Sequence, residues 1–404
     1  MNPINARPDD SVLSKRSMKD ILPSTFFVMK FCGLWEPWDL NPFFKVVYTA
    51  FRIIALLAML TVGISLVCLI IFTSKNTTEV FLENCFLLFT LFNAWVKALI
   101  LFLRSNDIKW LLKVLLEDQC QPFDSTEKEI QEKFDKYAWK CTLWYSNCVG
   151  ICTIITYFAI FSKQGDERIE MLNVWRPYNL KVHLYFWITW IHEFLGHIVT
   201  ASVHVAADTL IPGLMIQLCC QLKFLRHRLN KFSRRTEDFS KADVGKQNVL
   251  ERYLISATVR HHNIIYEFAN KLNKTFEEVL CIQFLISVIV ICFTVFNISK
   301  GGSANYSKLL MLYSYTACML SELFLYCFYG NELMTNSIDL QDGFAQANWL
   351  SFEDETKKSL IVSMIRSRNP ILISTCSVIL VNLDSFMMIL KTSYSAYTVL
   401  KDTV

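Results

Sequence analysis

The sequence is poor in charged residues and has little excess of either sign. Only 19% of its 404 residues are Asp, Glu, Lys or Arg, whereas an average soluble domain has about a quarter. The net charge of +4 is small and scattered, which argues against a nucleic-acid-binding protein. Residues 1–30 contain no apolar segment ahead of a cleavage site, so we expect no signal peptide to be removed.

Motifs typical of enzymes and metal sites are also missing. The sequence has no G-x-S-x-G nucleophile motif and no phosphate-binding glycine loop. His192 and His197 are five residues apart, which turns the second about 140° away from the first on a helix, whereas zinc-binding helices place their histidines at i and i+4. We therefore expect neither enzymatic activity nor a bound metal or other cofactor.

Apolar residues are what the sequence has in abundance. Hydrophobic residues make up 53% of the chain, with 31 Phe, and several uncharged runs reach the roughly 20 residues that cross a bilayer. The sequence predicts an all-α, polytopic membrane protein that forms a single domain over residues 1–404. Its seven spans are expected at about 44–72, 80–103, 141–161, 184–211, 279–298, 309–329 and 371–400.

Basic residues predict the orientation of these spans. If the N-terminus is cytosolic, 28 of the 40 lysines and arginines fall in inner segments and only 8 in outer ones. The C-terminus is then extracellular, which is the reverse of a G-protein-coupled receptor. The 14 cysteines all fall in spans or in inner segments, which argues against a disulfide-stapled extracellular domain.

Two long polar segments, 213–275 and 331–370, are expected in the cytosol. The first has leucines at helical spacing, and the second contains an amphipathic helix at about Trp349 to Ser367. Pro370 then separates that helix from the last span. We interpret these segments as a cytosolic helical anchor, and residues 371–400 as one terminal helix.

The terminal helix carries a polar stripe. Asp384, Met388, Lys391, Ser395 and Thr398 fall on one side at 100° per residue. Charges within a membrane segment are costly, so this side faces protein or water. The stripe is consistent with a pore-lining helix, and equally with a buried contact between helices.

The fourth span is the least apolar. Glu193, His197, Thr200, His204 and Asp208 share one helical face. One hypothesis makes them the wall of a ligand cavity or part of an ion path. The other pairs Glu193 with Lys97 or His197 only to hold helices together.

Aromatic and small residues gather at the outer ends of the second, third and sixth spans. An apolar cavity with a few hydroxyls or amides would suit a small volatile ligand, although ordinary helix packing explains each residue singly. The residues are Phe81, Phe86, Asn147, Gly150, Ile154, Tyr157, Tyr313 and Tyr315.

Motifs in the C-terminal half resemble the insect odorant receptor family. Residues 326–333, Tyr-Cys-Phe-Tyr-Gly-Asn-Glu-Leu, end the sixth span as in family members. The exit from the fourth span, from Asp208 through Gly213 to Gln221, is also similar. Further matches in order and spacing are Trp349, the helix around residues 360–364, Arg366, Pro370, Phe386 and residues 390–395.

The resemblance implies an odorant-binding subunit of a ligand-gated, non-selective cation channel in the plasma membrane of sensory dendrites. It implies a tetramer with the olfactory co-receptor, and this chain lacks the insertion that marks the co-receptor itself. The pore helix would carry an apolar gate at Val399, with Met388, Thr392, Ser395 and Ala396 also along the pore. The ligand would be a small volatile organic molecule. The implied ligand residues are Asn147, Gly150, Ile154, Phe186, Glu193 and Tyr313, to which the clustering above adds Phe81 and Phe86.

Three other functions remain open at this point. A gustatory-type receptor channel is the nearest, although the sequence after Tyr394 lacks the close of its Thr-Tyr motif. A G-protein-coupled receptor would require an extracellular N-terminus. A proton-coupled transporter would use the acidic and histidine side chains of the fourth span.

Overall fold

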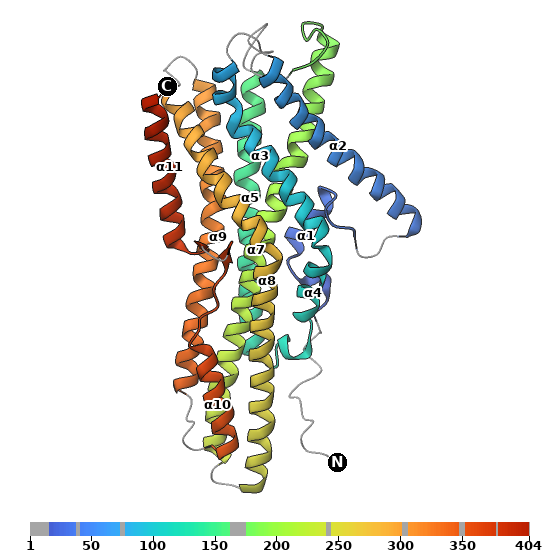
Figure 1. Ribbon diagram of the computed structural model, residues 1–404. Coiled ribbons are helices and arrows are strands. Elements are labelled where there is room, and N and C mark those ends of the chain that lie inside the picture. The colour runs from blue at the N-terminus through green and yellow to red at the C-terminus, as the bar shows by residue number, and fades with distance from the viewer. Residues whose placement is uncertain are drawn as a thin grey trace.

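The chain folds into an elongated bundle of long helices, seen in a computed structural model (Figure 1). The structure describes residues 16–37, 41–72, 77–161, 175–239, 244–300, 306–346, 352–376 and 379–403. The helices are α1 (Pro23–Phe31), α2 (Pro42–Phe72), α3 (Thr77–Leu103), α4 (Ser105–Val114), α5 (Ser125–Phe161), α7 (His183–Phe239), α8 (Val244–Lys300), α9 (Tyr306–Gln346), α10 (Asp354–Ser367) and α11 (Leu383–Thr403). Two 3-10 turns, η2 (Met18–Asp20) and η3 (Asp118–Cys120), and two short strands, β1 (Ser374–Thr375) and β2 (Ile379–Leu380), complete the described elements.

Five of the described helices are long and apolar enough to cross a membrane, as predicted for their spans. They are α2, α3, α7, α8 and α9. The other two predicted spans lie in α5 and α11, helices that also carry charged residues. In α5 these charges belong to the first half of the helix, ahead of the apolar segment that begins at Cys141.

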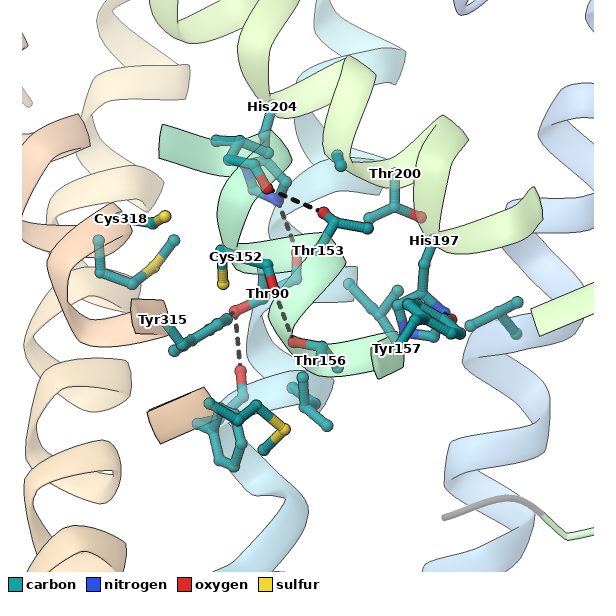
Figure 2. Close-up of a pocket in the computed structure, with 18 of the residues that line it drawn as sticks. Thr90, Cys152, Thr153, Thr156, Tyr157, His197, Thr200, His204, Tyr315 and Cys318 are labelled. Carbon is teal, nitrogen blue, oxygen red and sulfur yellow. Dashed lines mark hydrogen bonds between the residues drawn. The ribbon is translucent and has the colours of Figure 1, made fainter. Parts of the chain in front are cut away.

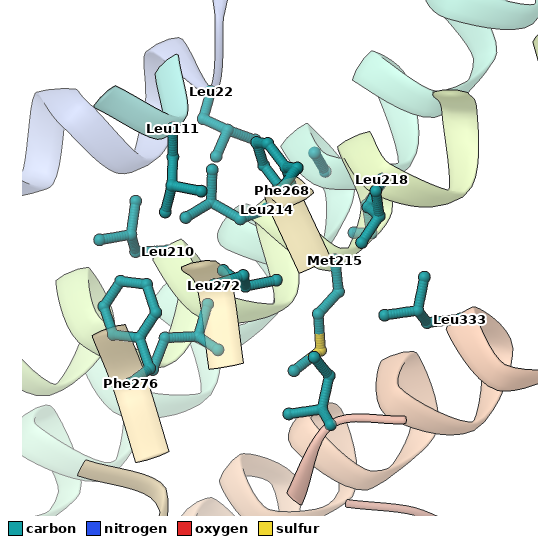
Figure 3. Packing of buried hydrophobic residues seen from close by; sticks show 14 of the residues in the cluster. Leu22, Leu111, Leu210, Leu214, Met215, Leu218, Phe268, Leu272, Phe276 and Leu333 are labelled. Carbon is teal, nitrogen blue, oxygen red and sulfur yellow. The ribbon is translucent and has the colours of Figure 1, made fainter. Parts of the chain in front are cut away.

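Helix α7 forms the centre of the bundle. Every residue from Val203 to Leu222 is buried, and α2, α3, α5, α8 and α9 all pack on this helix. Figure 3 shows its leucines meeting side chains of α8 and α9 in one apolar cluster. The part of α7 that protein surrounds needs no lipid-facing side, so it tolerates buried polar residues such as His204 and Asp208.

Four membrane helices continue far beyond their predicted spans. Helices α5, α7, α8 and α9 extend together towards α10 at the lower end of the bundle in Figure 1. The half-buried Arg228 of α7 contacts the start of α5, with its Nη2 2.7 Å from a Glu127 carboxylate oxygen. The polar segments predicted as an anchor are therefore helical and packed against one another.

The helix predicted at about Trp349 to Ser367 ends as expected but begins later, at Asp354. The backbone of Glu353 is extended, and the acidic residues after it favour a helix N-terminus. Trp349 lies outside the described residues.

The prediction of one continuous helix over 371–400 is wrong in its first third. Residues after Pro370 run extended into an antiparallel hairpin, in which Ser374 pairs with Leu380 and Thr375 with Ile379. The Asn382 side chain then accepts a hydrogen bond from the Ser385 N–H at 2.9 Å, a local interaction that favours a helix start. Helix α11 therefore begins at Leu383.

Gly330 of α9 allows the hairpin to lie against the bundle. A Cβ at this position would lie 2.1 Å from the Val381 carbonyl oxygen. The same region holds a disulfide between Cys281 of α8 and Cys376, a pairing that the sequence did not predict. Two contacts with neighbouring helices thus fix the segment that leads into α11.

Helix α11 packs on α8 and α9 through one side only. Ile389 and Ser393 are buried, and the Phe386 ring lies 5.8 Å from the Phe324 ring of α9. The residues predicted to line a pore lie on other sides: Met388, Thr392, Ser395 and Val399 are exposed in the single chain, and Ala396 is half-buried.

Candidate functional site

A cavity of about 210 Å³ lies between α3, α5, α7 and α9, with α2 closing one side. Figure 2 shows its side chains converging from these helices. Gly196 brings α2 close, since a Cβ there would lie 2.4 Å from a methyl of Val62. The lining residues are Val62, Leu66, Phe86, Leu87, Thr90, Leu91, Tyr145, Val149, Cys152, Thr153, Thr156, Tyr157, Glu193, His197, Thr200, Ala201, His204, Met311, Tyr315, Cys318 and Met319.

Hydroxyl and imidazole groups interrupt an otherwise apolar surface. The Tyr157 hydroxyl lies 2.7 Å from Nδ1 of His197, and the Tyr315 hydroxyl is hydrogen-bonded to Thr90. Thr153 and Thr200 donate to carbonyls of their own helices, which leaves their oxygens able to accept from a ligand. The cavity can thus hold an apolar molecule and orient a polar group on it.

Behind the cavity lies a fully buried ionic cluster. The Lys97 ammonium of α3 lies 2.6 Å from Asp208 Oδ1 of α7 and also contacts the Glu322 carboxylate of α9. Two tyrosine hydroxyls donate to Asp208, from Tyr326 at 2.6 Å and Tyr145 at 3.2 Å. These contacts compensate charges that would be prohibitively costly if left unpaired in a membrane.

His204 connects the cluster to the cavity. Its Nδ1 lies 3.1 Å from the Lys97 ammonium, while its ring also lines the cavity. Together with Asp208 and Glu322 it could form a metal-binding group by distance, but the Lys97 ammonium contacts all three and takes the place of a cation. The cluster is therefore an ion-pair network shared by three helices.

Glu193 lies at the other end of the polar stripe of α7. Its carboxylate pairs with Arg176, which precedes the helix. The hypothesis that Glu193 pairs with Lys97 or His197 to hold helices together is therefore wrong. Glu193, His197, Thr200 and His204 line the cavity, whereas Asp208 belongs to the ion-pair network.

The residues predicted to bind ligand separate into two groups. Phe86 and Glu193 line the cavity. Phe186 is buried beside Tyr157 in a small aromatic cluster next to it, and Phe81 is half-buried away from the lining.

The other four predicted residues lie away from the cavity. Ile154 and Tyr313 are 68% and 57% exposed on the outside of the bundle, and Asn147 is exposed on the same side of α5 as Ile154. A Cβ added at Gly150 would meet open space. The α5 residues that line the cavity are Tyr145, Val149, Cys152, Thr153, Thr156 and Tyr157, of which Tyr157 belonged to the predicted aromatic cluster, as did Tyr315 of α9.

Sequence reasoning also missed Arg176 and Glu322. Lys97 and Glu322 are charges within apolar spans, and that placement alone signals that each requires a buried partner. The partners themselves depend on how α3, α7 and α9 are arranged, which the sequence does not reveal.

A scan against protein-family models matches residues 76–394 to the family described as 7tm Odorant receptor. Among curated proteins, odorant receptor 46a, isoform A, of Drosophila melanogaster is 28% identical over 221 residues, or 54% of this chain and 55% of that protein. Odorant receptor 9a of the same species is 23% identical over 60% of this chain and 61% of its own length. The chain thus spans little more than half the length of these relatives.

Among solved structures, the olfactory receptor OR5 of Machilis hrabei in complex with eugenol superposes with a TM-score of 0.75. The match covers 96% of this chain and 99% of that one, at 14% sequence identity. The chain therefore has the seven-helix membrane fold that its sequence predicted.

Proposed function

This chain belongs to the odorant receptor family, and from that premise we propose that it is the odorant-binding subunit of a ligand-gated, non-selective cation channel. The observation that carries the proposal is the cavity between α3, α5, α7 and α9, which is mostly apolar and holds hydroxyl and imidazole groups. The family match favours an odorant receptor over the gustatory alternative.

The size and lining of the cavity define the class of ligand. Its 210 Å³ is below the roughly 300–1,000 Å³ of pockets that hold drug-sized molecules. The ligand is a small volatile organic molecule with an apolar body and one hydrogen-bonding group. His197, Tyr157 and Thr200 are suited to that group, and Phe86 and Met319 to the apolar body.

The pore belongs to α11. Its exposed side carries Met388, Thr392, Ser395 and Val399, with Ala396 at its edge, and Val399 is 64% exposed in the single chain. Neighbouring subunits would cover this surface in a tetramer formed with the olfactory co-receptor, with Val399 as the apolar gate. A ligand opens such a gate only if it binds the open state more tightly than the closed one.

Orientation follows from the basic residues. With 28 of 40 lysines and arginines on one side, the N-terminus and the anchor helices lie in the cytosol and the C-terminus of α11 lies outside. The protein then resides in the plasma membrane, in the dendrites of sensory neurons. A tag at Met1 that antibodies reach only after permeabilisation supports this orientation.

Whole-cell recording in cells that express this chain with the co-receptor tests the function. A panel of small volatile molecules should evoke a cation current that persists when GTP is depleted from the pipette solution. A response that requires GTP, or uptake of a ligand with no current, would reject the channel. Cells that express the co-receptor alone are the control.

A further inference from the structure

Two free cysteines line the cavity, and the proposed reversible binding of a ligand uses neither. Cys152 of α5 and Cys318 of α9 both line it, and Figure 2 shows both sulfur atoms among the lining side chains. The Cys318 thiol contacts the backbone of α5 at Cys148, one turn before Cys152. Any molecule bound in the cavity therefore lies beside two thiols.

The surroundings of the two sulfurs differ. The Ser314 hydroxyl lies 3.7 Å from Cys152 Sγ and is directed at it. The Cys318 thiol lies 3.3 Å from the Cys148 carbonyl oxygen, which accepts its proton in a hydrogen bond. The Ser314 hydroxyl can stabilise negative charge that develops on the Cys152 sulfur during a reaction, whereas the hydrogen bond to a carbonyl retains the Cys318 proton, so Cys152 is the nucleophile and Cys318 its neighbour.

We propose that Cys152 is a covalent attachment site for small electrophilic ligands, of which α,β-unsaturated aldehydes are the type. The inference rests on the proposed function, because it takes this cavity as the ligand site. The Cys152 sulfur forms a bond to the β-carbon of the ligand while the carbon–carbon π bond breaks. The thiol proton ends on the α-carbon, so the addition requires no oxidant or reductant.

The cavity supplies what such an addition requires beyond the thiol. The His197 imidazole, which lines the cavity, can donate a hydrogen bond to the carbonyl oxygen, where charge develops as the sulfur attacks. The apolar side chains hold the hydrocarbon chain in place, which raises the effective concentration of the reactive carbon. Ligands without the double bond fit the same space but bind reversibly.

A pair of matched aldehydes tests the proposal on the full-length chain co-expressed with the co-receptor. Membranes are incubated with 2-hexenal or with hexanal, which has the same length and carbonyl group but no conjugated double bond. Adducts are reduced with borohydride and located by peptide mass spectrometry. We expect Cys152 to gain the mass of one hexenal plus two hydrogens from the reduction, and to remain unmodified with hexanal.

Cys68 of α2 provides the internal control, because it is a free, partly exposed cysteine outside the cavity lining. Modification that followed exposure alone would reach Cys68 before the buried Cys152. Hexenal adducts on Cys68 or Cys318 with Cys152 unmodified would overturn the proposal. The comparison uses the wild-type chain, so it does not depend on whether a cysteine variant folds.

Recording the current separates this inference from the proposed function. In the wild type, the hexenal response should persist after washing while the hexanal response decays, and in Cys152→Ser both should decay alike; the Cys68→Ser variant should behave as wild type. An adduct on Cys152 without any current would leave the attachment site intact and count against the channel. A hexenal current without an adduct would retain the channel and reject the attachment site.

Discussion

The Lys97 ammonium lies 2.6 Å from the Asp208 carboxylate, with both side chains fully buried between membrane helices. Glu322 shares the same ammonium, so one lysine balances two carboxylates from two other helices. One oxygen of Glu322 has no hydrogen-bond partner among the described residues, which makes the ammonium its main compensation. Breaking such a network should cost far more than breaking a pair at the surface.

Replacing Lys97 with Met should destabilise the receptor by about 3–5 kcal/mol, since it leaves two buried carboxylates without a cation. The matched control is Lys308→Met, which breaks the exposed pair with Glu83 and should cost about 0–1 kcal/mol. Thermal unfolding of purified receptor measures both. Equal losses from the two variants would show that burial does not determine the effect.

Two neighbouring residues of α5 test the cavity. Thr153 lines it and Ile154 faces away from the bundle. Thr153→Trp should fill the space and abolish the rise in unfolding temperature that a ligand produces, whereas Ile154→Trp should preserve it. A ligand that still stabilises the Thr153 variant as it does the wild type would place the binding site elsewhere.

The stability of the anchor helices depends on the planar, forked guanidinium group of Arg228. Arg228 makes two hydrogen bonds to Glu127 and donates to the carbonyls of Gln119 and Gln121 at 2.6 and 2.8 Å. Arg228→Lys retains the charge but loses the planar fork, and should cost about 2–4 kcal/mol. Arg226→Lys, whose side chain is more exposed and contacts Asp339, should cost less than about 1 kcal/mol. Unfolding temperatures that fall equally would contradict this account.

Acid should weaken the anchor through Asp124, which lies ahead of α5. Burial alone would raise the pKa of its carboxyl, but hydrogen bonds from Lys231 and the Glu127 backbone N–H lower it to about 2. A carboxyl with a lowered pKa stabilises the fold above its ordinary pKa of 3.8, and that contribution is lost as the pH falls towards about 2.

The measurement is the unfolding temperature of Asp124→Asn and of wild type in detergent between about pH 6 and about pH 2. The difference should be largest at the upper end and should vanish as the pH falls. Glu129→Gln, an exposed position on the same helix, should differ little from wild type throughout. A constant deficit for the Asp124 variant would mean that its ionisation does not contribute.

The features that could be predicted from the sequence are those that helical spacing and the length of apolar runs determine. The shared face of Glu193, His197 and His204 could be derived from helical spacing, and all three line the cavity. Long apolar runs likewise located the spans, because a bilayer imposes their length and composition. The family motifs around Tyr326 pointed to a family that the model match then confirmed.

The features that could not be predicted depend on which residues pack against one another in the folded chain. In an uncharged span, lipid-facing and cavity-facing sides are equally apolar, so Ile154 and Thr153 could not be told apart as exterior and interior. The run from Ile371 to Leu383 is as apolar as a membrane helix, yet contacts with Gly330 and Asn273 hold its first part as a hairpin. The disulfide at Cys376 depends on the same packing.

The most direct test of the account places a cysteine at Val399 and records the ligand-evoked current with the co-receptor present. A membrane-impermeant, positively charged methanethiosulfonate applied from outside should reduce the current of Val399→Cys, because it puts a charge on the exposed side of α11 at the proposed gate. Ile389→Cys, on the buried side of the same helix, should be unaffected. A current that stays unchanged after mass spectrometry confirms modification of Val399→Cys would contradict the assignment of α11 as the pore helix.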